Sequence, residues 1–393
     1  MLGRRNLELL FVSSVLGFAF VTACGGSSSN DGSGSSSKTD KSCADTTCAK
    51  PPADPGSPQA NGSTPTVLAI SKLYLGDTNK NGDADPNAWK SLGYDLDGIV
   101  STPHGTNHCK PFEGANPTDV KTDGDNGIDN SFGENLLPII TTLAPDPGNS
   151  VNQSIADGSF TVMVKMDNVD SQANQTGVTS SLYGGASLGS PPNWDGNDMW
   201  PVVPELLNNS DKNDPKVKFP NSFVADNTWV SGSQGTLALS LSVQGYDLTL
   251  NIVNAVITMK LSADRKSASG GIIAGVIDTE SLVTELRQIA GSFDQSLCSG
   301  STFDSVAQEI KAASDIMNDG SNGDPKQTCN AISIGLGFDA SAVQLGDVAP
   351  AAKPQPDPCA AGGAGGTGGG GAGGMGGTGG AMGGAGGAAD AGI

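Results

Sequence analysis

The stretch LALSLSV at residues 237–243, followed after Gln244-Gly245 by YDLTLNI at residues 246–252, alternates apolar with polar side chains. An alternation with a period of two places the apolar side chains on one face of an extended chain. Gln244-Gly245 can form the turn that joins two such runs. The stretch therefore predicts an antiparallel hairpin with one buried face.

Further strands are predicted on both sides of this hairpin, some by the same alternation and others by short apolar runs. They cover residues 67–75, 160–166, 255–261, 270–277 and 332–338. The runs at 255–261 and 270–277 extend the hairpin into a four-strand meander. In the last run, Gly335 and Gly337 lie on the face opposite the large apolar residues, which predicts that a neighbouring segment packs closely there.

Three segments have helical patterns, at residues 131–143, 279–295 and 302–318. In the second and third, apolar side chains recur every three or four residues, whereas the first begins with the capping pattern of Ser131 and Glu134. Strands that are adjacent in sequence outnumber the helices. We therefore expect a mainly β (α+β) domain, an antiparallel β-sandwich or barrel-like fold with a two-helix insertion.

Composition divides the chain into four parts. We expect residues 1–23 to be a signal peptide, residues 24–65 a disordered Ser/Gly/Asp tether, residues 66–349 a single β-rich domain, and residues 350–393 a Pro-rich and then Gly-rich disordered tail. The tether and the tail hold too few large apolar side chains to offset the entropy lost on ordering.

The N-terminus has the features of a bacterial export signal. Arg4-Arg5 precedes an apolar run at residues 9–20, and Val21-Thr22-Ala23-Cys24 places small residues directly before a cysteine. This box resembles the lipobox of bacterial lipoproteins, and the resemblance implies cleavage before Cys24 and its acylation, for example with palmitate. Because Gly25-Gly26 follows rather than an aspartate, the resemblance implies the outer membrane, with the domain facing the periplasm or the cell surface. The alternative is an ordinary secreted protein that is cut elsewhere.

The six cysteines after Cys24 predict disulfides, because their number is even and the export signal implies an oxidising compartment. Six cysteines allow 15 pairings, and spacing alone leaves the choice open. We favour Cys43 with Cys48 as a small loop, and Cys298 with Cys329 because these two bracket a predicted helix. The six are Cys43, Cys48, Cys109, Cys298, Cys329 and Cys359.

The chain is strongly acidic, with 21 Lys and Arg against 41 Asp and Glu and a formal net charge of −20. Nucleic-acid binding depends on clustered Lys and Arg that neutralise phosphates, so we expect no nucleic-acid partner. Of the 41 acidic residues, 34 are aspartates and only 7 are glutamates. Acidity in general does not explain this excess of Asp.

The aspartates concentrate in loops that are typical of calcium sites. DTNKNGDAD at residues 77–85 has oxygen-bearing side chains at alternate positions and Gly82 in the sixth place, so it resembles EF-hand and dockerin-type loops, but Ala88 stands where that family has a bidentate Glu. DGDNGIDN at residues 123–130 is a second oxygen-rich loop. We predict a structural calcium ion at one site or two, although turns alone also favour these residue types. The predicted ligands are Asp77, Asn79, Asn81, Asp83, Asp85, Asp95, Asp97, Asp123, Asp125 and Asp129.

The stretch WDGNDMW at residues 194–200 predicts a glycan contact, because tryptophan rings stack on sugars while polar side chains bind hydroxyls. The residues concerned are Trp194, Asp195, Asn197 and Trp200. Packing of both tryptophans in the core is the alternative. We predict no catalytic residues, because Ser187 in a G-x-S-x-G pattern follows both histidines, contrary to the order Ser, acid, His.

Four stretches of the domain resemble predicted lipoproteins of the myxobacterial type, a group with no assigned activity. They are LGD at 75–77, GYDLDG at 93–98, DNSFG at 129–133 and CNAISIGLGF at 329–338. The resemblance implies only a shared domain and location.

Together these patterns predict a lipid-anchored cell-envelope protein with a calcium-stabilised β-rich domain. We expect this domain to be non-enzymatic, and either to bind a ligand, such as a glycan or another envelope component, or to act structurally. The alternative function is an extracytoplasmic hydrolase that uses Asp carboxylates or a bound metal.

Overall fold

The computed structural model describes residues 40–44, 47–103, 105–113, 115, 119–143, 145–232, 235–243, 246–298, 301–351 and 358–359. These residues belong to one compact unit. The predicted signal peptide, Cys24 and most of the predicted tail lie outside the described residues.

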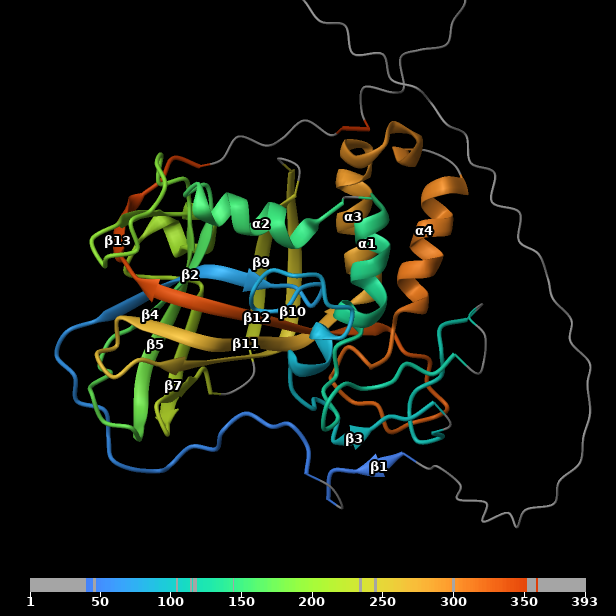
Figure 1. Cartoon of the computed structure of the whole chain (residues 1–393), viewed down its shortest axis with the longest axis horizontal. Coiled ribbons are helices and arrows are strands. Elements are labelled where there is room, and N and C mark those ends of the chain that lie inside the picture. The colour runs from blue at the N-terminus through green and yellow to red at the C-terminus, as the bar shows by residue number, and fades with distance from the viewer. Residues whose placement is uncertain are drawn as a thin grey trace, which may run out of the picture. The chain divides into compact units, whose positions relative to one another are not determined.

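Eight antiparallel strands close into a barrel (Figure 1). They follow the order β5-β4-β2-β12-β11-β10-β8-β7, and pairing of β5 with β7 closes the ring. The predicted mainly β, barrel-like fold is therefore confirmed. The strands are β2 (Thr66–Tyr74), β4 (Thr161–Met166), β5 (Gln175–Gly185), β7 (Val217–Ala225), β8 (Thr228–Val230), β10 (Tyr246–Leu261), β11 (Ser267–Asp278) and β12 (Ala331–Ala342).

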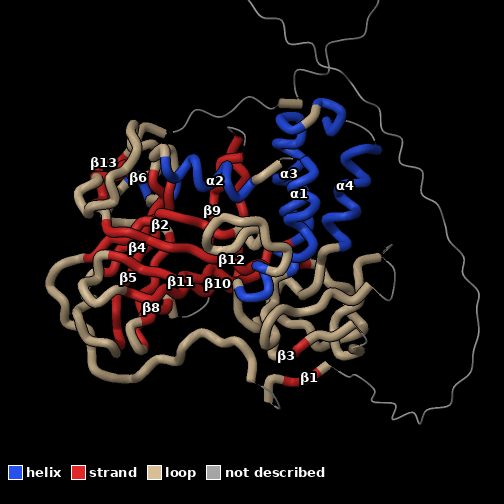
Figure 2. The backbone as a smooth tube through the Cα atoms, viewed as in Figure 1, coloured by secondary structure: helices blue, strands red, loops and turns tan. Residues whose placement is uncertain are grey.

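In the described part of the chain, five further strands lie outside the ring (Figure 2). One of them pairs with β10, two form a parallel pair beside β5, and two form a small sheet of their own. They are β9 (Gly235–Val243), β6 (Met199–Val202), β13 (Gln344–Val348), β1 (Lys41–Ser42) and β3 (Ile99–Val100).

The hairpin predicted from residues 237–252 is present as β9 and the first part of β10. Leu237 lies opposite Ile252 and Leu239 opposite Leu250, and all four side chains are buried in the main core. The alternation in sequence is thus explained by one face of the hairpin turned towards that core.

The predicted four-strand meander is wrong in one respect, because residues 246–261 form the single long strand β10. The register of β10 shifts between Ile252 and Ala255, and Asn254 between them has a φ of 52°. Such a bulge shifts by one position the residues that face the core. The single strand β10 therefore has the sequence pattern of two separate strands.

Two helices lie between β11 and β12, which confirms the predicted two-helix insertion. They are α3 (Thr279–Phe293), capped by the Asp278 side chain that accepts a hydrogen bond from the Ser281 N–H, and α4 (Ser301–Ala312). The predicted third helix ends earlier than expected, because α4 stops at Ala312 and residues 313–318 leave it. Apolar side chains of both helices continue the barrel core.

The predicted helix at 131–143 is present as a π-helical turn (Phe132–Leu136) that leads into α1 (Leu137–Leu143). Helix α2 (Pro147–Ala156) was not predicted, because only Val151 and Ile155 provide large apolar side chains for its buried face. None of the helices in the described residues combines the length and apolar composition that crossing a bilayer requires.

All six cysteines after Cys24 form disulfides. The predicted Cys43–Cys48 bond is confirmed, whereas Cys298 pairs with Cys359 and Cys329 pairs with Cys109. The predicted Cys298–Cys329 pair is therefore wrong. The reason is that the chain around Cys329 pairs with the loop that contains Cys109. The Cys329 N–H donates to Lys110 O, and the Cys109–Cys329 Cα distance is 5.2 Å.

The predicted disordered tether, residues 24–65, is wrong for its second half. Residues 47–65 make specific backbone contacts with the domain, including hydrogen bonds from the Ala60 N–H to Thr176 O and from the Gly62 N–H to Asn168 O. These hydrogen bonds and the Cys43–Cys48 disulfide order a segment that has few apolar side chains.

Candidate metal centre

The segment at residues 92–98 lies against the outside of the barrel and places two aspartates on one side. Tyr94 and Leu96 pack against apolar residues of the barrel strands, so Asp95 and Asp97, which alternate with them, face away from this contact. This segment is also the close neighbour that the sequence predicted at Gly335. A Cβ atom on Gly335 would lie 2.0 Å from the Leu92 carbonyl oxygen.

The turn at residues 123–129 supplies two more aspartates. The Gly124 N–H donates to Ile128 O at 2.8 Å, which brings Asp123 and Asp129 to the two ends of a tight turn. Asp129 is only 2% exposed, and Asn130 next to it is equally buried.

Asp315 joins these residues from a distant part of the sequence. It follows α4 in the connection to β12, where its carboxylate accepts hydrogen bonds from the Ser333 N–H and the Ser333 hydroxyl. The residue as a whole is partly exposed, but its carboxyl group lies deep in the protein.

The structure thus brings five aspartates into one group, which we call the carboxylate cluster: Asp95, Asp97, Asp123, Asp129 and Asp315. Carboxylate oxygens of Asp95, Asp97 and Asp129 lie within 4.8 Å of one another. Asp123 and Asp315 are close enough to repel the others. Four of the ten predicted metal ligands therefore lie together, and Asp315, which was not predicted, lies with them.

Backbone N–H groups orient the carboxylates of the cluster. The hydrogen bonds run from Gly98 N to Asp95 Oδ1, from Ile99 N to Asp97 Oδ1, from Ser101 N to Asp123 Oδ2 and from Leu96 N to Asp129 Oδ2, at 2.6–2.7 Å. A carboxylate oxygen has several lone-pair sites, so one N–H group fixes its direction and leaves acceptor capacity free.

The carboxyl groups of the cluster hold their protons far more strongly than ordinary aspartates. Burial, reinforced by repulsion from the neighbouring carboxylates, raises the pKa of Asp97 to about 6 and of Asp123 to about 9. Burial likewise raises the pKa of Asp315 to about 7 and that of Asp129 well above its usual value. Among the described residues, no Lys or Arg nitrogen lies within ion-pair distance of these carboxylates.

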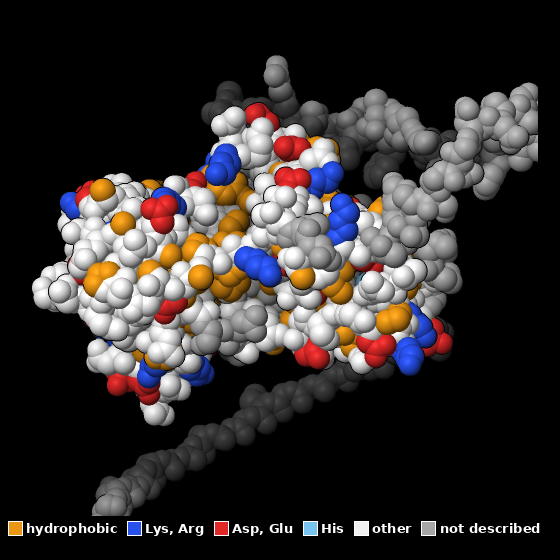
Figure 3. All heavy atoms as spheres, turned by 90° about the horizontal axis from the view of Figure 1, so that it is seen from below, with side chains coloured by type: hydrophobic (Ala, Val, Ile, Leu, Met, Phe, Trp, Pro, Cys, Tyr) orange, Lys and Arg blue, Asp and Glu red, His pale blue; other side chains and the backbone are white. Residues whose placement is uncertain are grey.

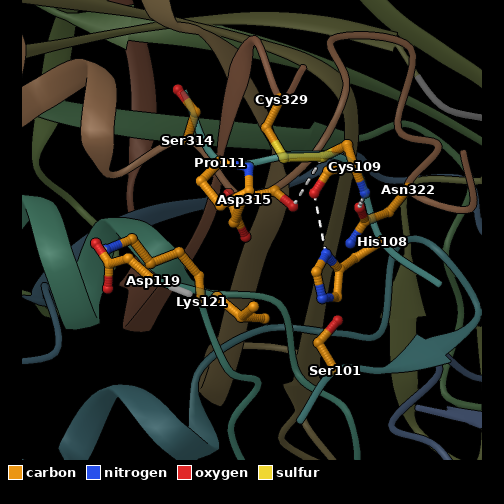
Figure 4. Close-up of a pocket in the computed structure, with 11 residues that line it drawn as sticks. Ser101, His108, Cys109, Pro111, Asp119, Lys121, Ser314, Asp315, Asn322 and Cys329 are labelled. Atoms are coloured by element: carbon orange, nitrogen blue, oxygen red, sulfur yellow. Dashed lines mark hydrogen bonds and ion pairs between the residues drawn. A yellow bond between two sulfur atoms is a disulfide. The ribbon is translucent and has the colours of Figure 1, made fainter. Parts of the chain in front are cut away.

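Two buried oxygen atoms at the cluster lack hydrogen-bond partners. They are Asp97 Oδ2 and the hydroxyl of Ser101, a residue that is only 6% exposed. Ser101 and Asp315 both line a small cavity of about 10 Å³ beside the Cys109–Cys329 disulfide (Figure 4). A space of this size holds about one water molecule or ion.

The Asp95 carboxylate also faces the disulfide between Cys43 and Cys48. Asp95 Oδ2 lies 2.8 Å from Cys43 Sγ, which is a close contact and not a hydrogen bond because a disulfide sulfur carries no proton. For the same reason neither cysteine offers a thiolate to a metal ion. The ligand chemistry of the cluster is therefore oxygen only.

The predicted loop at residues 77–85 does not join the cluster. It closes on itself, because Asn79 Oδ1 accepts hydrogen bonds from the N–H groups of Asn81 and Asp83 and the Asp85 N–H donates to Asp77 O. The tip of this loop is exposed. Asp77 lies instead beside the start of α2. Burial raises the pKa of Asp77, and a hydrogen bond from the Gly148 N–H offsets part of that rise. Asp125 is exposed as well.

The predicted glycan contact is divided between core and surface. Trp200 is fully buried and its indole N–H donates to Ala186 O at 2.6 Å, so its ring is not available for stacking on a sugar. Trp194 is partly buried and lies against Trp200, with 5.5 Å between ring centroids. Asp195 and Asn197 are exposed and bond to each other within a turn.

On the face that Figure 3 shows, the acidic side chains of the described residues do not form one patch. The face in Figure 3 carries single Asp and Glu side chains scattered among Lys and Arg. Part of the Asp excess is instead explained by the buried carboxylate cluster.

Comparison of the chain with protein-family models, with curated proteins and with solved structures finds no match.

Proposed function

We propose that this chain is a lipid-anchored cell-envelope protein whose β-barrel is a non-enzymatic domain that binds calcium for its stability. The observation that carries the proposal is the convergence of five aspartates in one partly buried cluster, with no Lys or Arg in ion-pair contact with them among the described residues. We propose a structural role for the barrel in the envelope, or binding of a ligand such as a glycan.

A divalent cation resolves the electrostatic problem that this cluster creates. Charged carboxylates that lie together in a protein interior repel one another and lose hydration, which disfavours folding unless a counter-charge is present. Calcium prefers six to eight oxygen ligands at flexible geometry, whereas zinc and the softer transition metals favour His and Cys. An oxygen-only cluster of aspartates supports calcium over those metals.

The disulfides support the proposed location. Stable disulfides form in oxidising compartments outside the cytosol. Since all six cysteines after Cys24 are paired, the count leaves Cys24 as the cysteine available for acylation. Acyl chains at Cys24 would anchor the protein to a membrane, and Gly25-Gly26 after Cys24 supports the outer membrane, with the domain facing the periplasm or the cell surface.

The small space at the cluster supports an ion over hydrolysis. Substrate pockets of enzymes have volumes of roughly 300–1,000 Å³, whereas the cavity beside Asp315 has about 10 Å³. Release of a product that disappears on Asp97→Asn substitution would favour the hydrolase alternative instead.

We expect calcium to raise the melting temperature of the chelator-treated protein by about 5–10 °C. An ion present at 100 times its Kd adds about 2.7 kcal/mol to the unfolding free energy, and each kcal/mol moves the Tm of a domain of this size by about 2–4 °C. Differential scanning calorimetry with excess EGTA or with calcium chloride measures the effect. An unchanged Tm, together with no calcium in the purified protein, would contradict the proposal.

We expect Cys24→Ser to abolish acylation while the barrel still folds. Growth with a labelled fatty acid should label the unchanged protein and not the variant, and the variant should move from the membrane to the soluble fraction. Cys24 lies outside the described residues, so its loss removes the anchor and none of the three disulfides. Mass spectrometry that finds an unmodified mature N-terminus in the unchanged protein would exclude the lipid anchor.

A further inference from the structure

We infer that the proposed calcium ion lies between Asp95, Asp97 and Asp129, and that it fastens to the barrel the N-terminal segment that leads towards Cys24. We call this segment, residues 40–50, the strap; its residues 45 and 46 lie outside the described residues. The inference rests on the proposed calcium binding, and it assigns the ligands of the ion and the part of the chain that the ion controls.

The three carboxylates have the spacing of groups that share one ion. One carboxylate oxygen from each of them lies within 4.8 Å of the other two. Calcium binds oxygen ligands at about 2.3–2.6 Å, so two ligands on opposite sides of the ion lie about 5 Å apart. Three oxygens with this spacing can therefore contact one calcium ion, while second carboxylate oxygens and water complete its coordination.

One oxygen of this group lacks a partner in the protein. Asp97 Oδ1 accepts a hydrogen bond from the Ile99 N–H at 2.7 Å, whereas Asp97 Oδ2 is inaccessible to solvent and has no hydrogen-bond partner. Asp129, which is 2% exposed, accepts from the Leu96 N–H at 2.6 Å. A buried carboxylate oxygen without a donor costs free energy. A cation satisfies this oxygen and also offsets the repulsion between Asp97 and Asp129.

Asp123 and Asp315 contribute negative charge to the site and are not assigned as ligands. Neither belongs to the group of carboxylates whose oxygens approach within 4.8 Å, although both repel Asp129. The cavity beside Asp315 is lined by none of the three assigned ligands, so we place the ion outside that cavity.

The strap is bound to the loop that carries Asp95 and Asp97. Strand β1 of the strap pairs with β3, and the Cys43 N–H donates to Gly98 O at 2.9 Å. The Cys43–Cys48 disulfide lies against the first ligand, with 2.8 Å between Cys43 Sγ and Asp95 Oδ2. The position of this part of the strap therefore depends on the position of the Asp95 carboxylate.

Ala49 extends the strap to the turn that carries Asp129. The Ala49 N–H donates to Asn126 O at 2.9 Å, and Ala49 O accepts from the Asp95 N–H at 2.7 Å. One strap residue thus bridges the two loops, as the ion does between their carboxylates. Without the ion, repulsion between the charged carboxylates drives the loops apart and weakens both hydrogen bonds.

The charges of the strap also favour its docking when a cation is present. Asp40 is 7% exposed, accepts hydrogen bonds from the N–H groups of Thr102 and Asn107 at 2.9 and 3.0 Å, and repels Asp97. Lys50 at the other end attracts Asp95, but Lys50 is exposed, and water screens such an attraction. Docking therefore adds a buried negative charge beside the ligands, and the ion offsets it.

The ligand assignment is tested with Asp129→Asn and Asp125→Asn, a matched pair in one turn. Each variant removes one negative charge, but Asp125 is exposed and is not an assigned ligand. Calcium chloride is titrated by isothermal calorimetry into the full-length mature protein after treatment with EGTA and dialysis. We expect Asp129→Asn to weaken calcium binding at least about 100-fold, because removing even an outer-shell partner weakens metal sites about 10- to 100-fold. Asp125→Asn should bind calcium within about threefold of the unchanged protein, since water and salt screen an exposed charge.

Asp129→Asn should still fold. The asparagine keeps an oxygen that can accept from the Leu96 N–H, and it removes a buried carboxyl group. The calcium-free variant should therefore melt no lower than the calcium-free parent, while the rise of Tm with calcium is lost.

The strap is tested in the unchanged protein by hydrogen exchange and mass spectrometry, in calcium chloride and in EGTA. Exchange times are chosen at which the peptides from β11 and β12 remain protected in both conditions, so that only local opening is observed. We expect the peptide that covers residues 40–50 to exchange at least about 10-fold faster in EGTA, because the Cys43 and Ala49 amides lose their acceptors.

Ala49→Pro tests the same coupling in the opposite direction. Proline removes the N–H group that binds Asn126 O and leaves the charge of the site unchanged. Coupling between two sites is reciprocal, so a loosened strap should weaken calcium binding about fivefold or more. Circular dichroism of the variant shows whether the barrel is intact.

The outcomes separate this inference from the proposed function. If the unchanged protein binds no calcium, the proposed function itself is wrong. If it binds calcium and Asp129→Asn binds equally well, or Asp125→Asn loses as much affinity as Asp129→Asn, the ligand assignment is overturned and the calcium-stabilised function stands. Equal exchange of the strap in calcium and in EGTA would likewise overturn its coupling to the ion and leave the proposed function intact.

Discussion

Replacing Asn130 with alanine is expected to lower the unfolding free energy by roughly 3–5 kcal/mol. Asn130 is 2% exposed, and its side-chain N–H groups donate to the carbonyl oxygens of Trp89, Leu92 and Gly335 at 2.9–3.2 Å. Its Oδ1 accepts from the N–H groups of Gly133 and Gly335, each at 3.0 Å. One side chain therefore joins the segment at 92–98, the turn before α1 and strand β12.

Alanine would leave all of these backbone groups without a partner in the interior. Each buried polar group that loses its hydrogen bond costs about 1–3 kcal/mol, and a water molecule that enters the space recovers part of the sum. Because Asn130 follows Asp129 directly, we also expect weaker calcium binding. Urea unfolding followed by circular dichroism measures the stability.

Asn197→Ala is the matched control. Asn197 is exposed in a surface turn, where its contact is with Asp195, so its replacement should change stability by no more than about 0.5 kcal/mol. If Asn130→Ala were as stable as Asn197→Ala, the network around Asn130 would not hold the loops to the barrel.

The strands of the barrel could be predicted from the sequence, whereas its closure could not. Residues 237–252 and 332–338 alternate because each strand buries one face, and this pattern is local. Closure depends on the pairing of β5 with β7, which register shifts interrupt between Gln175 and Ser180. A sandwich and a barrel built from the same strands have the same alternation, so the sequence alone left both open.

The metal centre could be predicted in part for a similar reason. Asp95, Asp97, Asp123 and Asp129 were found because their loops have a local excess of oxygen-bearing side chains. The loop at 77–85 has the same excess and does not join them, since the pattern also suits a turn that closes on its own backbone. Asp315 was missed because it lies within a segment of helical periodicity, and Ser101 because a single serine has no distinctive pattern.

Without calcium, the protein is expected to lose stability as the pH rises from 5 to 8. The pKa values of Asp97, Asp315 and Asp123 in the folded protein are raised to about 6, 7 and 9, whereas unfolded aspartates titrate near 3.9. Between those limits the folded state binds more protons than the unfolded state. The stability that protonation provides is therefore complete below pH 4 and is lost as the pH rises through each folded pKa.

For each group, the unfolding free energy falls by about 1.4 kcal/mol per pH unit between the pKa of the unfolded state and the pKa of the folded state. Summed over the three groups, this slope gives a loss on the order of 8 kcal/mol between pH 5 and pH 8, which the coupling between their titrations lessens. Calcium should remove most of this dependence, since an ion that binds the charged carboxylates replaces their protons. Urea unfolding in EGTA and in calcium chloride across this range measures both curves.

Asp315→Asn isolates the cluster from the other titrating groups of the chain. The variant lacks one carboxyl group and lessens the repulsion on Asp123 and Asp129, so its curve in EGTA should fall less steeply than that of the unchanged protein. Histidines and exposed acids are the same in both proteins and cancel in the difference. A calcium-free curve that stays flat or rises from pH 5 to pH 8 would mean that the carboxylates are already charged and separately solvated. In that case the Asp excess would be explained by turns alone, and a bound ion would not be needed to fold this domain.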